Sequence, residues 1–164
     1  MLNKNDWVKA WLTKARNDLK AAERVINSED PLLDIACYHS QQCVEKCLKG
    51  FLTSKNVTID KIHDLVRLNS ICCGIDKDFF EIHDISILLT PYAVETRYPG
   101  DLDDYSIDEA ISALIFCSLY IKLLLIIWDI KNSYLCSAED CSSISCCNNS
   151  AMSSLLIPQA REIL

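Results

Sequence analysis

The sequence predicts an all-α protein, an up-and-down bundle of four main helices with one short extra helix. Apolar residues recur at helical spacing over most of the chain as far as Ile130. Only three glycines and four prolines occur in 164 residues, which is too few for the tight turns of an all-β fold. Half of the residues are apolar, enough for a packed core in one domain of this length.

The first two predicted helices span residues 5–28 and 31–54. In the first helix the apolar residues recur every three or four positions: Trp7, Val8, Trp11, Leu12, Ala15, Leu19, Ala22, Val25 and Ile26. Asp30 and Pro31 then form a typical helix start, with Asp as the N-cap and Pro at the first helical position. They predict the beginning of the second helix.

The second helix carries the stretch ACYHSQQCVEKCLKGFL at 36–52, around which the rest of the bundle is expected to pack. Helical geometry gathers small and apolar residues on one arc: Ala36, Cys43, Val44, Cys47, Leu48 and Phe51. A polar stripe falls on the opposite side: Tyr38, Gln42, Glu45 and Lys49. Gln41 lies at the edge of the apolar arc, where a half-buried amide needs hydrogen-bond partners or costs stability.

Two shorter helical segments are expected next. A short third helix covers 61–73 and ends at Gly74. Asp76 can cap a fourth helix, whose course is interrupted by Pro91. Because proline removes a helical hydrogen bond, we expect a kink there or a restart with Thr90 as the cap.

The last predicted helix spans 106–131 and is the longest. Ser106 and Glu109 form a capping box at its start. Its portion 114–128 is apolar on nearly every side but contains Lys122, and it is shorter than the ~20 residues that span a bilayer. We therefore expect no membrane partner. Because one neighbouring helix layer cannot cover so apolar a helix, we expect a homodimer formed through 106–131.

The chain divides into a helical bundle at 1–132 and a Ser- and Cys-rich tail at 133–164. The tail has no apolar period, so we expect it to be poorly ordered. Its four cysteines lack the C-x2-C spacing of structural zinc sites, and no metal is predicted: Cys136, Cys141, Cys146 and Cys147.

The net charge and the cysteine content indicate which partners and which cellular compartment to expect. The net charge of −7 argues against bulk electrostatic binding of nucleic acid. It does not exclude a small local basic pocket. The chain has ten cysteines but opens on a charged, amphipathic segment without an apolar leader. We therefore expect free thiols in a reducing cytoplasm.

Three short motifs occur in order along the bundle: QQCVEKCLK at 41–49, HDL at 63–65 and TRYP at 96–99. They resemble three motifs of the HEPN domain family, namely its QQAVEKxLK helix, its H-D-L segment and its T-R-Y-P motif. The motifs occur in the same order and at similar spacing as in the family, and the resemblance covers 7–128.

The resemblance implies a dimeric helical bundle that often acts beside a minimal nucleotidyltransferase, as a toxin–antitoxin or nucleotide-handling pair. Many HEPN proteins are metal-independent ribonucleases with an Arg-x4-6-His motif on the last long helix. This chain has neither Arg nor His at 106–130, and none of its histidines follows an arginine at that spacing: His39, His63 and His83. We therefore assign no catalytic residue and no cofactor.

The predicted ligand-binding residues come from the three motifs: Gln42, Lys46, Lys49, His63, Asp64, Arg97 and Tyr98. Arginine offers a planar fork and lysine a point charge for phosphate oxygens. We expect the bundle to bring Arg97 beside the edge formed by Gln42 and Lys49, so that a small cationic recess forms on an acidic protein.

Each of these side chains also has a structural interpretation. Arg97 can pair with neighbouring carboxylates, and the lysines can lie on a solvated face. At the start of a helix the negative charge of Asp64 interacts favourably with the helix dipole. His63 can act there as a cap or hinge. Gln41 and Gln42 can bond a base or ribose, or Gln41 can serve backbone groups near Pro91.

Three functional hypotheses follow. The first is a non-catalytic module that binds a nucleotide or a nucleotidyltransferase partner. The second is a ribonuclease with a rearranged site, in which His63 and Arg97 meet from different helices, with RNA as substrate. The third is a structural dimerisation module.

Overall fold

The computed structural model describes residues 3–59, 61–94 and 105–128, all in helices and their connections. The elements are α1 (Lys4–Ile26), α2 (Leu33–Ser54), α3 (Leu65–Cys73), η1 (Lys77–Ile82), α4 (His83–Leu89), η2 (Thr90–Ala93) and α5 (Ile107–Trp128), where η denotes a 3-10 helix. No strand occurs among these residues. The predicted all-α fold is confirmed.

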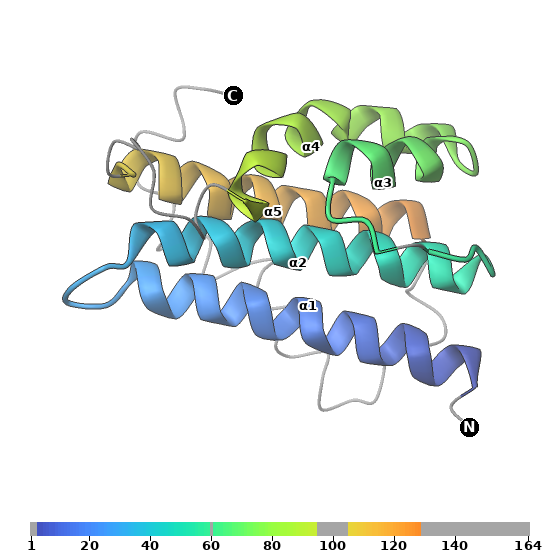
Figure 1. Cartoon of the computed structure of the whole chain (residues 1–164), viewed down its shortest axis with the longest axis horizontal. Coiled ribbons are helices and arrows are strands. Elements are labelled where there is room, and N and C mark those ends of the chain that lie inside the picture. Colours follow the sequence, from blue (N-terminus) through green and yellow to red (C-terminus); the bar gives the residue numbers. More distant parts are fainter. Residues whose placement is uncertain (1–2, 60, 95–104, 129–164) are drawn as a thin grey trace. The chain divides into compact units, whose positions relative to one another are not determined.

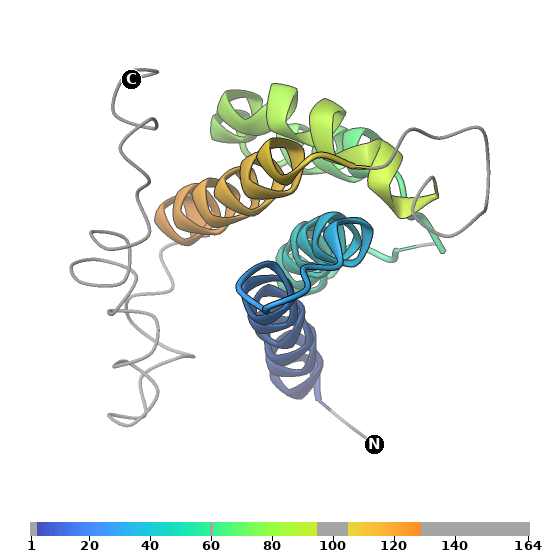
Figure 2. The ribbon, with the colours of Figure 1, turned by 90° about the vertical axis from the view of Figure 1, so that its left-hand side faces the viewer.

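The central element is α2, which packs against α1, α3, α5 and η2. Figure 1 shows that α1 and α2 run in opposite directions and that α2 and α5 run in the same direction, while Figure 2 shows α3 and α4 as a second layer beside α5. The described residues form one compact unit. The largest fully buried side chains include Phe51, Phe79 and Tyr120, contributed by three elements.

Several helix starts carry side-chain caps. The capping box at the start of α5 is present: the Ser106 backbone N–H donates to Glu109 Oε2 at 2.8 Å, and the Glu109 N–H donates to Ser106 Oγ at 3.2 Å. A second box between Asn3 and Asp6 starts α1. Asp76 caps η1 by accepting from the Asp78 N–H.

The start of α2 differs from the prediction. The helix begins at Leu33, and its N-cap residue, Leu32, makes no side-chain capping bond. Asp30 and Pro31 belong to the preceding turn, where Ser28 Oγ donates to the Asp30 carbonyl at 2.8 Å. The expected Asp–Pro start was therefore wrong, because the hydrogen bond from Ser28 holds the Asp30 carbonyl in the turn before the helix.

The fourth predicted helix is divided into three short elements. The chain runs as η1, then α4, then η2, which contains Pro91 in its first turn. The expected restart at the proline is confirmed, but Leu89 rather than Thr90 occupies the cap position. Instead, Thr90 Oγ1 donates back to the Ser86 carbonyl at 2.7 Å.

Two further predictions concern the end of the chain. The predicted tail at 133–164, and the last residues of the helix predicted to reach 131, lie outside the described residues. Among the helices that are described, none combines the length and the apolar content that crossing a membrane requires.

Candidate functional site

Three of the four residues in the polar stripe of α2 lie inside the bundle, and Tyr38 is half-buried. Glu45 is 3% exposed and Lys49 is 6% exposed, while Gln42 is also buried. The stripe was expected on the side of α2 opposite the core, where Lys49 would either bind phosphate or lie in solvent. Most of the stripe is buried because α2 is the central helix, with α1 packed along it and the connection before α3 crossing it.

Glu45 is the centre of this polar region. Its Oε1 accepts from Lys49 Nζ at 2.9 Å and lies 3.1 Å from His63 Nδ1, and its Oε2 accepts from the side-chain amides of Gln41 and Gln42 at 3.3 Å. Burial raises the pKa of Glu45, but the hydrogen bond and charge of Lys49, the amide of Gln41 and the charge of His63 outweigh it. The net effect is a lowered pKa, so Glu45 is a carboxylate at neutral pH.

The two glutamine amides join Glu45 to the loop before α3. Gln42 Nε2 donates to Gln41 Oε1 at 2.8 Å, and Gln41 Nε2 donates to the His63 carbonyl at 3.2 Å. Gln41 therefore does serve a backbone group, as its structural interpretation expected. The group belongs to His63, however, and not to the segment around Pro91.

The hydrogen bonds continue from Gln42 to α1. Lys46 Nζ donates to Gln42 Oε1 at 2.9 Å and lies 2.6 Å from Asp18 Oδ2, and Asp18 Oδ1 lies 3.0 Å from His39 Nδ1. We name the connected side chains the α2 polar network: Asp18, His39, Gln41, Gln42, Glu45, Lys46, Lys49 and His63. The network therefore links two histidines that are separated along the chain.

Charge within the network is balanced. The ammonium group of Lys46 pairs with Asp18, and that of Lys49 pairs with Glu45 and lies 5.7 Å from the ring centre of Trp11. These four charges sum to zero. An anionic ligand at this site therefore needs further positive charge, from a protonated imidazole or from a residue outside the network.

His63 is the most exposed member of the network. Its side chain is 59% exposed, while the carboxylate that holds its Nδ1 is almost fully buried. A carboxylate partner on one ring nitrogen fixes the orientation of an imidazole and leaves the other nitrogen for a ligand or a proton. The arrangement can therefore bind a polar group or carry a proton at Nε2.

The remaining predicted site residues fall into two groups. Asp64 is the N-cap of α3 and accepts from the Arg67 N–H at 3.0 Å, as its structural interpretation expected. Arg97 and Tyr98 lie outside the described residues, so their position beside Gln42 and Lys49 stays a prediction. Within the described ranges no three metal-ligating side chains come together.

A comparison with known protein families matches residues 8–126 to the HEPN domain. The chain belongs to the HEPN family. The match runs from α1 into α5 and includes both motifs that build the network, 41–49 and 63–65. A search of curated proteins and a search of solved structures each found no match.

Four members of the α2 polar network were not among the predicted ligand-binding residues: Asp18, His39, Gln41 and the central Glu45. His39 and Lys46 are seven positions apart, so helical periodicity alone places them on one face of α2. Their common partner Asp18 belongs to α1, and only the packing of α1 against α2 identifies it. A search for carboxylates on the neighbouring helix could have suggested the pair without fixing it.

Proposed function

We propose that this HEPN protein is a non-catalytic accessory module that binds a nucleotide at the His63 end of the α2 polar network. In this proposal it acts in the cytoplasm beside a minimal nucleotidyltransferase, as one half of a toxin–antitoxin-like pair. The observation that carries the proposal is the exposed His63 imidazole, held by the buried Glu45 carboxylate. The absence of an Arg-x4-6-His motif from the sequence supports the non-catalytic assignment.

The network supports binding through preorganisation. Glu45 and the amides of Gln41 and Gln42 hold one another in place before a ligand arrives, so little ordering remains to oppose binding. Because both lysines are already paired with carboxylates, we expect His63 and Arg97 to bind the phosphate. In this proposal the imidazole contacts a phosphate or ribose oxygen, and Arg97 supplies the guanidinium fork.

We expect ATP or GTP to bind the purified protein with measurable heat in calorimetric titration. His63→Ala and Arg97→Ala are each expected to weaken binding by about tenfold or more, because each removes a direct contact worth about 1.4 kcal/mol. His83→Ala is the control, since this histidine lies on α4 and outside the network. No heat at millimolar nucleotide, or the same heat for His63→Ala as for the wild type, would count against the site.

A ribonuclease with an atypical site is the second candidate, and the contact between His63 and Glu45 favours it. A carboxylate-held imidazole is a common arrangement for acid–base catalysis. Incubation with total RNA in the presence of a chelator separates the two proposals. Cleavage by the wild type that is lost in His63→Ala would replace the binding function with a catalytic one.

The surface of α5 supports a homodimer. In the monomer the fully buried side chains of this helix form one stripe among its described positions: Ala110, Ala113, Cys117, Tyr120 and Leu124. Ile107 and Ile115 remain exposed, and partly buried apolar residues flank them. A second copy packed along 106–131 covers this surface in our proposal.

We expect Ile115→Glu to convert a dimer into a monomer in light scattering at micromolar concentration, because the substitution places a charge in the proposed apolar interface. Leu32→Glu is the matched control, since Leu32 is an exposed apolar residue at the start of α2. Leu124 is unsuitable as a probe because it is buried in the monomer core. A monomeric wild type, or a variant that remains dimeric, contradicts the interface.

A further inference from the structure

The 3-10 geometry of η1 sorts its side chains into three ridges that continue into the first turn of α4. Residues three positions apart are eclipsed in such a helix. One ridge is buried and consists of Phe79 and Ile82. The second faces a pocket and consists of Lys77, Phe80 and His83. The third is exposed and acidic: Asp78, Glu81 and Asp84.

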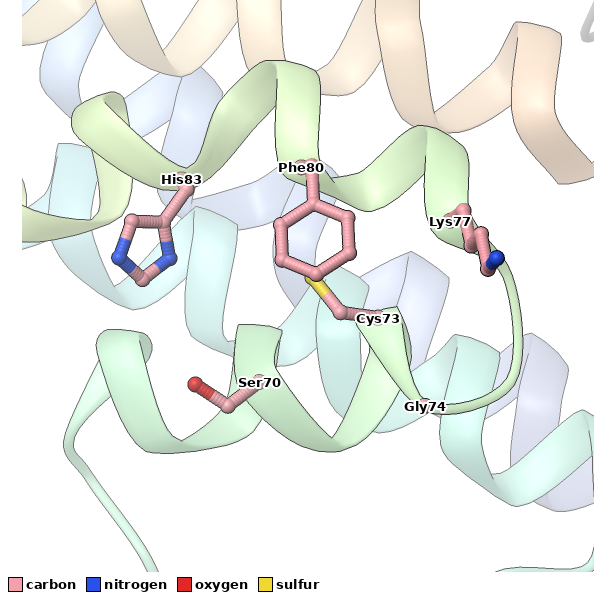
Figure 3. A pocket seen from close by; sticks show the side chains of 6 residues that line it. All are labelled: Ser70, Cys73, Gly74, Lys77, Phe80 and His83. Carbon is pink, nitrogen blue, oxygen red and sulfur yellow. The ribbon is translucent and has the colours of Figure 1, made fainter.

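The pocket lies between η1 and the end of α3 and has a volume of about 480 Å³. Figure 3 shows Phe80 in the middle of its upper wall, with His83 at one end and Lys77 at the other. The lower wall is built from two small residues of α3, Ser70 and Cys73, and from Gly74 directly after this helix. The short side chains leave room beneath the Phe80 ring, which is 63% exposed.

The apolar surface continues beyond the pocket onto α4. Ile87 lies four positions after His83 and is therefore on the same face of the helix, and Leu88 lies four positions after Asp84. Both are about half exposed. Phe80, Ile87 and Leu88 thus form an apolar strip beside an acidic ridge, a pattern that marks an interaction surface rather than scattered surface residues.

We propose that the α3–η1–α4 groove docks an amphipathic, positively charged segment of a partner protein. An apolar side chain of that segment enters the pocket beneath Phe80, and its lysines or arginines lie along the ridge formed by Asp78, Glu81 and Asp84. The groove uses none of the residues of the α2 polar network, so the proposal is independent of nucleotide binding.

Charge selects this occupant over two others. Residues 75–94 contain four acidic residues and one lysine, which gives +1 − 4 = −3. A second copy of the same face would therefore bring like charges together. Residues 129–164 of this chain contain four acidic and two basic residues, or +2 − 4 = −2, and are repelled as well. A basic segment is attracted, and its cations can also pack over the Phe80 ring.

His83 provides a polar anchor at one end of the groove. Its Nδ1 is buried and has no hydrogen-bond partner among the described residues. Buried polar atoms are generally hydrogen-bonded, and an unpaired one is costly. A backbone or side-chain group of the docked segment can satisfy this nitrogen, which also fixes the register of the segment.

The test uses the full chain and two synthetic peptides of about four helical turns, measured by fluorescence anisotropy. One peptide combines leucine with lysine, and the other has glutamate in place of each lysine. We expect the leucine–lysine peptide to bind and the leucine–glutamate peptide not to bind. Phe80→Ser should weaken binding about tenfold or more, and Glu81→Lys should weaken it several-fold with a reduced dependence on salt.

The matched control is Leu32→Ser, which removes an exposed apolar side chain from another part of the molecule. It should leave peptide affinity unchanged, and since Phe80 is exposed, both variants should keep the thermal stability of the wild type. Failure of the leucine–lysine peptide to bind, or equal affinity for the wild type and Phe80→Ser, overturns the proposal. Equal weakening by Leu32→Ser also overturns it, because peptide binding would then depend on exposed apolar side chains in general rather than on this groove.

Discussion

Replacement of Glu45 by alanine is expected to lower the free energy of unfolding by about 3–5 kcal/mol. The substitution removes the acceptor for Lys49 Nζ and for the amides of Gln41 and Gln42. Lys49 is almost fully buried, so its ammonium group would remain in the bundle without its carboxylate. Urea denaturation followed by circular dichroism measures the loss.

Two controls separate the network from a general effect of mutation. Glu29→Ala, at an exposed position of the turn between α1 and α2, should change stability by no more than about 0.5 kcal/mol. Glu45→Gln keeps the shape of the side chain and should cost less than Glu45→Ala, since an amide can still accept from Lys49. A loss below about 1 kcal/mol for Glu45→Ala would show that the network contributes little to stability.

Comparison of Glu45→Gln with the wild type also tests how Glu45 contributes to the loss of stability at acidic pH. The folded-state pKa of Glu45 is lowered, with burial outweighed by Lys49, Gln41 and His63. The stabilisation from Glu45 is therefore present above its unfolded-state pKa and is lost as the pH falls through the folded-state value. Glu45→Gln should show a weaker fall in stability below about pH 4 than the wild type.

The sequence predicts those features of the fold that depend on local spacing. Apolar periodicity locates α1, α2 and α5, and the capping residues Ser106 and Asp76 mark two starts correctly. The Asp30–Pro31 start failed because Ser28, outside the helix, competes for the same backbone. Local signals of this kind are reliable only where no neighbouring side chain offers the backbone another partner.

The site shows where sequence reasoning ends. Gln42, Glu45 and Lys49 have the spacing of a polar face, which a lone helix would expose. Their burial depends on α2 having neighbours on every side, and this is a property of the whole bundle. Asp18 could not be connected with Lys46 from the sequence, because the register between α1 and α2 is set by packing.

The clearest measure of how the second layer is attached to the bundle is the Asn69–Tyr120 pair. Tyr120 on α5 donates its hydroxyl to Asn69 Oδ1 at 3.0 Å, and Asn69 Nδ2 on α3 donates to the Phe79 carbonyl at 3.1 Å. Both side chains are fully buried. Burial raises the pKa of Tyr120, which a hydrogen bond with Ser86 partly offsets, so the phenol is neutral and can donate.

Asn69→Ala is expected to destabilise the protein by about 2–4 kcal/mol, because it leaves a cavity and a buried Phe79 carbonyl without its donor. Tyr120→Phe should cost only about 1–2 kcal/mol, since it removes the hydroxyl but retains the buried ring. The double variant should lose about 1 kcal/mol less unfolding free energy than the sum of the two single losses, which a double-mutant cycle in urea measures. Strict additivity would mean that the hydrogen bond between α3 and α5 is energetically silent and that apolar packing alone attaches this layer.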